Sequence, residues 1–198
     1  MRIGVFGGTF DPLHTGHLVL AEQCREQCHL DEVWFVPAAI PPHKQDLVIS
    51  TARTRCDMIE FAIAGNPQFK LSRVEIDRPG PSYTVTTLEQ IRDEDPTREL
   101  FLLVGADSIR DLPTWREPDR IQDLATIVAV NRGRAVPTDA QRQALQPMIA
   151  DRIHFVGMPG IDISATDIRQ RVASGRSIRY LVPRAVESYI HQHHLYRV

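Results

Sequence analysis

The sequence predicts an α/β fold with a doubly wound, mainly parallel sheet and a small C-terminal helical lobe. Short uninterrupted apolar runs alternate with amphipathic segments, and the runs recur at intervals of roughly 25–30 residues. Apolar runs without alternation are typical of strands buried on both faces, and such strands form parallel sheets covered by helices. No repeat, low-complexity segment or linker divides the chain. We therefore expect one domain over residues 1–198, with approximately residues 164–198 as a helical subregion.

Each element follows from the period of its apolar residues. The apolar runs predict strands or short extended segments at residues 3–6, 33–36, 69–71, 74–76, 100–104, 125–130 and 152–156. Apolar residues three and four apart predict helices at residues 15–28, 52–63, 85–92, 164–172 and 184–191. Ligands of such folds bind at the carboxyl ends of the strands. The segments expected at those ends are residues 7–8, 37–44, 105–107 and 131–134.

The charge composition excludes a protein held on nucleic acid by its overall field. The chain has 23 Lys and Arg residues against 25 Asp and Glu residues, which gives a net charge of −2. A protein bound to DNA mainly by charge is more basic than this. Only two of the cations are lysines, Lys44 and Lys70. We therefore expect no nucleic-acid partner, and any anionic ligand must be bound by a few well-placed residues.

The cysteines and the apolar runs indicate the compartment. Cys24, Cys28 and Cys56 are too few, and odd in number, for a disulfide framework, which favours a reducing environment. The N-terminus lacks the long apolar region of a signal peptide, and no run approaches the ~18 apolar residues of a membrane span. We expect a cytoplasmic protein without a membrane partner. Homo-oligomer formation is left open by the sequence.

The strongest chemical signal is the segment Gly-Gly-Thr-Phe-Asp-Pro-Leu-His-Thr-Gly-His at residues 7–17. Glycines directly after a strand let the backbone approach a phosphate, and the helix that follows directs free N–H groups at the same point. His14 and His17 are three residues apart, so both imidazoles lie on one helix face and can donate to phosphate oxygens. A junction with surface histidines is the alternative, but the full string favours a phosphate site. Neither a Walker P-loop nor a Gly-x-Gly-x-x-Gly fingerprint is present.

Two further segments offer groups for an anion. Ser164 is a natural N-cap with Asp167 as the partner of a capping box, and Arg169 lies one turn into the same helix. A helix N-terminus with two hydroxyls and an arginine also forms an anion site, and both interpretations can hold together. Lys44 follows two prolines and a histidine, where a mobile cation could close over a triphosphate. A solvated surface lysine is the alternative.

Aromatic and metal-ligating residues carry weaker signals. Trp115 follows a predicted strand in a polar run, where its ring could stack on an aromatic ligand or simply hold a loop half-buried. Two clusters have metal-binding residue types but lack the second ligand pair of a zinc site, so we expect no protein metal site. These clusters are Cys24, Cys28 and His29, and His191, His193 and His194.

Residues 7–17 resemble the N-terminal signature of the nucleotidyltransferases that carry the H-x-G-H motif, here His-Thr-Gly-His at residues 14–17. The long form is similar to that of the bacterial nicotinate-nucleotide adenylyltransferase family. The resemblance recurs at residues 41–44, 82–84, 105–107, 115 and 163–169. It implies a Rossmann-like nucleotidyltransferase fold. It also implies transfer of AMP from ATP to nicotinic acid mononucleotide, with release of pyrophosphate, in NAD biosynthesis.

The resemblance further implies roles for individual residues. Those expected to be catalytic are His14, His17, Lys44 and Arg169. Those expected to bind ATP are Gly7, Gly8, Thr9, Phe10, His14, His17, Lys44, Gly105, Asp107, Ser164, Thr166 and Arg169. Those expected to bind the mononucleotide are Thr84 at the carboxylate, Asp107 at the ribose, Trp115 at the ring, and Arg116. Three positions depart from the family pattern: Ala165 replaces the usual serine, Arg116 replaces a common aromatic residue, and residues 131–134 lack Arg-Pro-Gly.

The implied reaction needs no covalent enzyme intermediate. The acceptor phosphate is already an anionic nucleophile, so in-line positioning and stabilisation of the pentavalent centre are sufficient. Mg²⁺ is expected as a phosphate-bridging cofactor with few or no direct protein ligands. Two alternatives are left open: transfer to nicotinamide mononucleotide or another phosphate acceptor, and a nucleotide-binding sensor without turnover. The presence of His14, His17 and Arg169 argues against the sensor.

Overall fold

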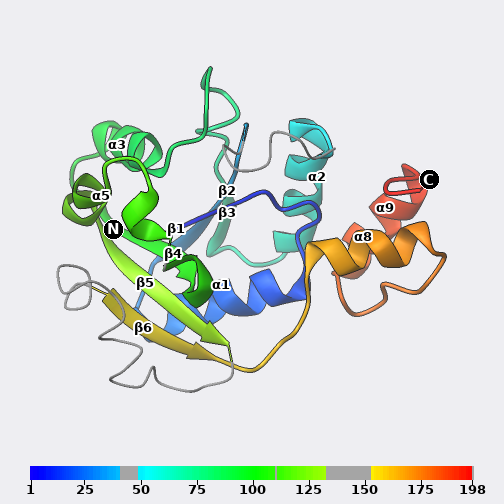
Figure 1. Cartoon of the computed structure of the whole chain (residues 1–198). Helices are drawn as coiled ribbons and strands as arrows, with labels where there is room; N and C mark the ends of the chain where they lie inside the picture. The colour runs from blue at the N-terminus through cyan, green and yellow to red at the C-terminus, as the bar shows by residue number, and fades with distance from the viewer. Residues whose placement is uncertain (41–48, 110, 133–152, 198) are drawn as a thin grey trace.

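The computed structural model describes residues 1–40, 49–109, 111–132 and 153–197, which build one six-stranded sheet. Neighbouring strands are parallel throughout, in the order β3-β2-β1-β4-β5-β6 (Figure 1). The predicted doubly wound parallel sheet is therefore confirmed. The strands are β1 (Arg2–Gly8), β2 (Glu32–Pro37), β3 (Phe69–Leu71), β4 (Glu99–Gly105), β5 (Ala125–Arg132) and β6 (Ile153–Met158).

The helices agree with the prediction wherever the apolar period is strong. These are α1 (Thr15–Gln27), α2 (Ala52–Ile63), α3 (Thr84–Glu94), α8 (Ala165–Ala173) and α9 (Arg184–Gln192). Between β4 and β5 the structure adds three short helices that the sequence analysis missed: α4 (Ala106–Ile109), η1 (Leu112–Thr114) and α5 (Pro118–Leu124). They are too short to show a helical period.

The extended segment predicted at residues 74–76 is wrong, because these residues form a turn. The Val-Glu-Ile pattern would place the glutamate on a solvent face. In the structure Glu75 is instead buried, at 7% exposure, and its Oε1 accepts a 2.6 Å hydrogen bond from the Thr87 hydroxyl of α3. A partner twelve residues away in sequence therefore overrides the local pattern.

The two faces of the sheet bury separate apolar layers, and successive residues of a central strand alternate between them. On β4, Leu100 and Leu102 belong to the layer under α3 and α5, whereas Phe101 and Leu103 belong to the layer under α1 and α2. All four side chains are buried. Burial of each such side chain stabilises the fold by roughly 1.5–3 kcal/mol. Two-sided burial explains why these strands lack polar alternation.

A third apolar cluster joins the C-terminal helices to the remainder of the chain. Ile168 of α8, Val186 of α9 and Met58 of α2 are each fully buried in it. Figure 1 shows α8 and α9 on the side of the molecule where α2 lies, far from β6. The Thr15 N–H, at the start of α1, donates a 2.9 Å hydrogen bond to the Leu181 carbonyl. The helical lobe is thus held against α2 and the start of α1.

The strand order creates a crevice between the carboxyl ends of β1 and β4. From β1 the chain proceeds outward through β2 to β3, and it then returns to β4 on the other side of β1. Connections diverge at this point, which is where open α/β sheets bind their ligands. β1 ends at Gly8 and β4 ends at Gly105, two of the residues predicted to bind nucleotide.

Candidate active site

The predicted phosphate-binding segment forms a tight turn between β1 and α1. Gly8 closes β1, and a Cβ at this position would lie 2.9 Å from the Phe10 ring. Phe10 itself is buried and has a left-handed backbone φ of 50°. Only glycine at position 8 therefore lets the chain fold back over this ring. His14 follows as the N-cap of α1, so the N-terminus of α1 faces the turn.

His14 and His17 are stacked at this helix start. Their ring centroids are 3.6 Å apart with an interplanar angle of 18°. The His14 backbone N–H donates to His17 Nδ1 at 3.2 Å, so the proton of a neutral His17 is carried on Nε2. Phe6 and Phe10 contact the His17 ring edge-on, at centroid distances of 5.8 and 5.1 Å. These contacts fix both the ring plane and the donor atom of His17.

Gly16, between the two histidines, keeps the His14 ring in place. A Cβ at this position would lie 3.1 Å from His14 Nδ1 and 3.2 Å from Cε1. We expect Gly16→Ala to displace the imidazole and lower kcat by about 10- to 100-fold, because small misplacements at a reacting centre are costly. The free energy of unfolding should change by less than about 1 kcal/mol, since the helix propensity that alanine gains over glycine offsets the cost of moving the buried ring. Steady-state kinetics and thermal unfolding test this; an unchanged kcat would contradict it.

Arg169 reaches the same turn from α8, a distant part of the chain. Its Nη1 donates to the Asp11 carbonyl at 2.8 Å, and its Nη2 donates to Thr166 Oγ1 at 3.3 Å. Ser164 caps α8 by accepting from the Asp167 N–H at 3.1 Å. The second half of the predicted capping box is not formed in the described residues, because the Asp167 carboxylate accepts from Arg171 Nε at 2.6 Å. The structure thus brings two predicted anion-binding segments together.

A cavity of about 180 Å³ lies at the carboxyl ends of β1 and β4. Five residues predicted from the sequence line it: Gly7, Gly8, Thr9, Thr84 and Trp115. Thr84 is the first residue of α3, and Trp115 directly follows η1. Trp115 is also half-buried against the apolar layer under α3 and α5, as the structural interpretation expects, and its role at an aromatic ligand stays a prediction. The cavity coincides with the crevice that the strand order creates.

The same cavity contains polar residues that the sequence analysis did not single out as ligands. They are Glu75, Ser82 and Thr87. The Thr87 hydroxyl donates to Glu75 and accepts from Arg78 Nη2 at 3.3 Å. Ser82 Oγ accepts the Ala39 N–H at 2.9 Å, which ties the segment after β2 to the start of α3. One feature of the sequence could have indicated Thr87: it is a polar residue on the buried face of a helix.

Arg116, which replaces an aromatic residue of the family pattern, contacts the ring of Tyr83. Its guanidinium carbon lies 4.8 Å from the ring centroid, and its Nε pairs with Glu117 at 3.3 Å. Tyr83 is the N-cap of α3, so Arg116 contacts the residue that directly precedes Thr84 of the cavity wall.

Several predicted residues cannot be placed from the structure. Lys44 and residues 41–43 lie outside the described residues, as does Arg134. Gly105 ends β4, but the side chains of Asp107 and Arg132 are outside the described part of the structure. The roles expected for these residues stay predictions.

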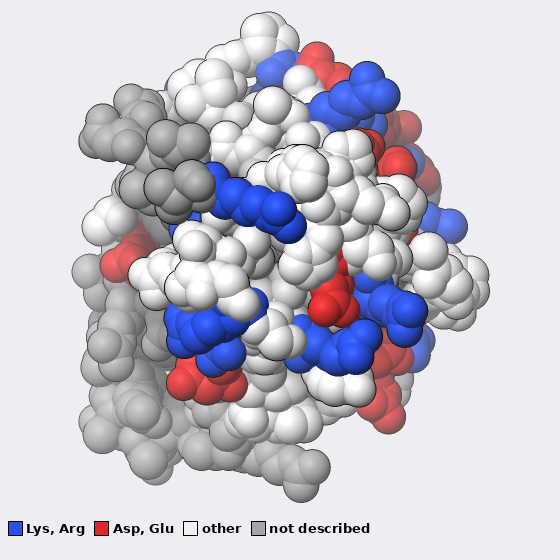
Figure 2. Space-filling view, turned by 90° about the vertical axis from the view of Figure 1, so that its right-hand side faces the viewer, with Lys and Arg blue, Asp and Glu red and all other residues white. Residues whose placement is uncertain are grey.

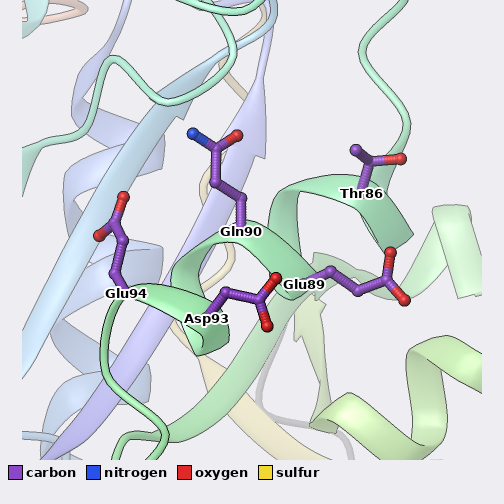
Figure 3. A pocket seen from close by; sticks show the side chains of 5 residues that line it. All are labelled: Thr86, Glu89, Gln90, Asp93 and Glu94. Carbon is purple, nitrogen blue, oxygen red and sulfur yellow. The ribbon is translucent and has the colours of Figure 1, made fainter.

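A second hollow lies on the outer side of α3 and is lined by acidic and polar side chains (Figure 3). Its lining residues are Thr86, Glu89, Gln90, Asp93 and Glu94. No predicted site residue lines it. Glu89 pairs with Arg120 at 3.1 Å and Glu94 with Arg98 at 3.0 Å. The hollow is therefore a charged solvent face, opposite the buried side of the helix.

The three cysteines are buried side chains of the apolar core. Burial raises the pKa of the Cys24, Cys28 and Cys56 thiols, which disfavours the thiolate and with it nucleophilic catalysis.

Within the described residues, no group of three or more His, Cys, Asp or Glu side chains could hold a metal ion. Over that same part of the chain, no helix is long and apolar enough to cross a membrane. Acidic and basic side chains are interspersed on the face shown in Figure 2.

Comparison with known proteins identifies the class. A family model described as cytidylyltransferase-like matches residues 5–171, which include the second half of β1, the stacked histidines and Arg169. The fold and the site together define a nucleotidyltransferase. A probable nicotinate-nucleotide adenylyltransferase of Thermomicrobium roseum is 49% identical over 198 residues, covering 99% of this chain and 92% of the relative. One from Thermus thermophilus is 49% identical over 197 residues, covering the whole of both chains.

The chain belongs to the nicotinate-nucleotide adenylyltransferase family, a family of nucleotidyltransferases that act in NAD biosynthesis. A solved structure supports the fold independently. Nicotinic acid mononucleotide adenylyltransferase of Plasmodium falciparum, solved in complex with NaAD, superposes with a TM-score of 0.80. The superposition covers 98% of this chain and 97% of that chain, at 17% sequence identity. The predicted Rossmann-like fold is thereby confirmed.

Proposed function

We propose that the chain, acting as one catalytic domain, transfers AMP from ATP to nicotinic acid mononucleotide. A phosphate oxygen of the mononucleotide attacks the α-phosphorus of ATP. The bond from that phosphorus to the oxygen bridging to the β-phosphate breaks, and pyrophosphate leaves with the bonding electrons. The observation that carries the proposal is the convergence of the stacked His14–His17 pair and Arg169 on the turn after β1. Gly8 and Thr9 of the same turn line the cavity at the β1–β4 crevice.

Stabilisation of negative charge is the chemistry that these residues supply. The Nε2–H of His17 and the backbone N–H groups after Gly8 donate to phosphate oxygens, in a geometry fixed before substrate binds. Arg169 neutralises charge on the triphosphate. Lys44 is the further cation proposed at the phosphates. No base is needed, because the attacking phosphate is already ionised at neutral pH.

The cavity accommodates the second substrate in this proposal. Trp115 offers an aromatic face to the pyridine ring, and Thr84 offers hydrogen-bond donors to its carboxylate. Arg116, held against Tyr83, adds positive charge near that end of the cavity. Asp107 is proposed to bind a ribose. The buried, unpaired cysteines are in keeping with a reducing compartment, and we place the reaction in the cytoplasm.

Mg²⁺ fits the site as an ion that enters bound to ATP. The donors at the turn after β1 are imidazoles, an arginine and backbone N–H groups, which bind anions, whereas Mg²⁺ prefers oxygen ligands. The ion would therefore be held by phosphate oxygens and water rather than by these side chains. When bound, it lowers the negative charge that the approaching acceptor phosphate meets.

A pyrophosphate-release assay over a panel of acceptors tests the proposal. With ATP and Mg²⁺, nicotinic acid mononucleotide should give a kcat/KM at least tenfold above that of nicotinamide mononucleotide. A phosphopantetheine acceptor should give no release above background. Preference for the amide would overturn the assigned substrate, and ATP binding without release for any acceptor would favour the sensor.

A further inference from the structure

The carboxylate of Asp11 is buried beside the proposed phosphate site, at 3% exposure. Its Oδ2 accepts the Ser50 backbone N–H at 3.1 Å, and its Oδ1 accepts the Tyr196 hydroxyl at 2.6 Å. The carbonyl of the same residue accepts Arg169 Nη1 at 2.8 Å. Asp11 thus links the turn after β1 to Arg169 and, through its side chain, to two distant segments of the chain.

Arg55 balances this buried charge from α2. It is 2% exposed, its Nη1 donates to the Thr9 carbonyl at 2.9 Å, and its Nε donates to the Ser50 carbonyl at 3.1 Å. Burial lowers the pKa of the Arg55 guanidinium, and the negative charge of Asp11 opposes that effect. Arg55 therefore bonds the turn at the Thr9 carbonyl and places a positive charge near the Asp11 carboxylate.

Among the residues that hydrogen-bond to the Asp11 carboxylate, Tyr196 is the more distant in sequence, 185 residues away. Its backbone has a left-handed φ of 61°, a conformation that a bulky side chain adopts only where the surroundings compensate for it. Burial and the charge of Asp11 raise the pKa of its hydroxyl, so the hydroxyl stays protonated and remains a donor. The strained backbone and the short hydrogen bond together indicate that the chain end is held for this contact.

We propose that Tyr196 is a positioning residue for ATP binding, because its hydrogen bond to the Asp11 carboxylate fixes the Asp11 carbonyl against Arg169. The inference rests on the proposed role of Arg169 at the phosphates. The Asp11 carboxylate is anchored on two sides, by Ser50 and by Tyr196. Loss of the tyrosine hydroxyl leaves one anchor and an unsatisfied buried oxygen, so residue 11 can rotate and its carbonyl no longer orients the guanidinium.

The full chain with Tyr196→Phe tests the proposal against a matched control, Tyr189→Phe. The Tyr189 hydroxyl also donates to a carboxylate, Asp57 Oδ2 at 2.8 Å, but away from the turn. We expect Tyr196→Phe to raise the KM for ATP about tenfold, the size expected from one hydrogen bond to a charged group. The KM for nicotinic acid mononucleotide should stay within twofold, and Tyr189→Phe should leave both constants within twofold. If both constants rise together, or both variants behave alike, the proposal is wrong.

Asp11→Asn weakens the same hydrogen bond by changing its acceptor, and it is the second variant to measure if Tyr196→Phe folds poorly. It should also raise the KM for ATP selectively. A double-mutant cycle with Arg169→Ala then separates the two proposals. Arg169→Ala alone should raise the KM for ATP, and Tyr196→Phe should add less than twofold in that background. A normal KM for ATP in Arg169→Ala would overturn the role of Arg169. A raised KM to which Tyr196→Phe adds its full tenfold would overturn only the role of Tyr196.

Discussion

His17→Ala is expected to lower kcat by about 10²–10³-fold while the Kd for ATP rises much less, because a preorganised donor to the developing charge acts mainly in the transition state. The structure supports this asymmetry. The His14 N–H donates to His17 Nδ1, and the rings of Phe6 and Phe10 contact the imidazole. The Nε2–H of His17 is therefore a donor of fixed orientation before the reaction begins. Single-turnover kinetics with ATP and nicotinic acid mononucleotide, together with equilibrium ATP titration, measure the two effects separately.

Two further variants make this result specific. His17→Gln keeps an N–H donor near the position of Nε2 and should recover part of the lost kcat. His154→Ala removes an exposed histidine on β6 and should leave kcat within twofold. If His17→Ala turned over at a near-normal rate, the proposed mechanism would be wrong.

Arg55→Leu is expected to lower the free energy of unfolding by about 2–6 kcal/mol, because each buried carbonyl that loses its donor costs about 1–3 kcal/mol. The substitution leaves the Thr9 and Ser50 carbonyls without their donor, and it leaves the Asp11 carboxylate without its nearby cation. Urea unfolding of the full chain measures the change directly, provided that the slope with denaturant is unchanged.

The control lies on the same helix. Arg53 is exposed on α2, and Arg53→Leu should change the free energy of unfolding by less than about 0.5 kcal/mol, as surface substitutions usually do. Arg55→Lys keeps the charge but cannot make both hydrogen bonds, so its loss should be intermediate. Equal losses for Arg53→Leu and Arg55→Leu would show that the buried guanidinium of Arg55 does not stabilise the turn.

Much of the fold was predictable because its signals are local. β4 is an unbroken apolar run because its two faces are buried by different layers. The helices α1 and α2 bury apolar residues three and four positions apart. The short helices between β4 and β5 were missed because α5, the longest, has only seven residues. The turn at residues 74–76 was mistaken for a strand because its decisive contact, Glu75 with Thr87, is tertiary.

The same division holds for the candidate site. Its chemistry is concentrated in two short segments, residues 7–17 and 164–169, where glycine conformation and helix capping act between near neighbours. A sequence alone is therefore sufficient to locate the histidines, the capping serine and Arg169. The polar lining of the cavity at Glu75 and Thr87 carries no comparable local pattern.

Within the described residues, the sequence by itself predicted the order along the chain of the six strands and the five longer helices, because apolar periodicity and turn propensity act over a few residues. Its resemblance to the nucleotidyltransferases indicated which residues carry the proposed chemistry. Only the tertiary structure decided how those residues are held. Arg169 meets Asp11 across 158 positions of sequence, and Tyr196 meets it across 185. Contacts of that separation depend on how the layers pack, and a buried carboxylate takes whichever donors the packing brings within hydrogen-bond distance.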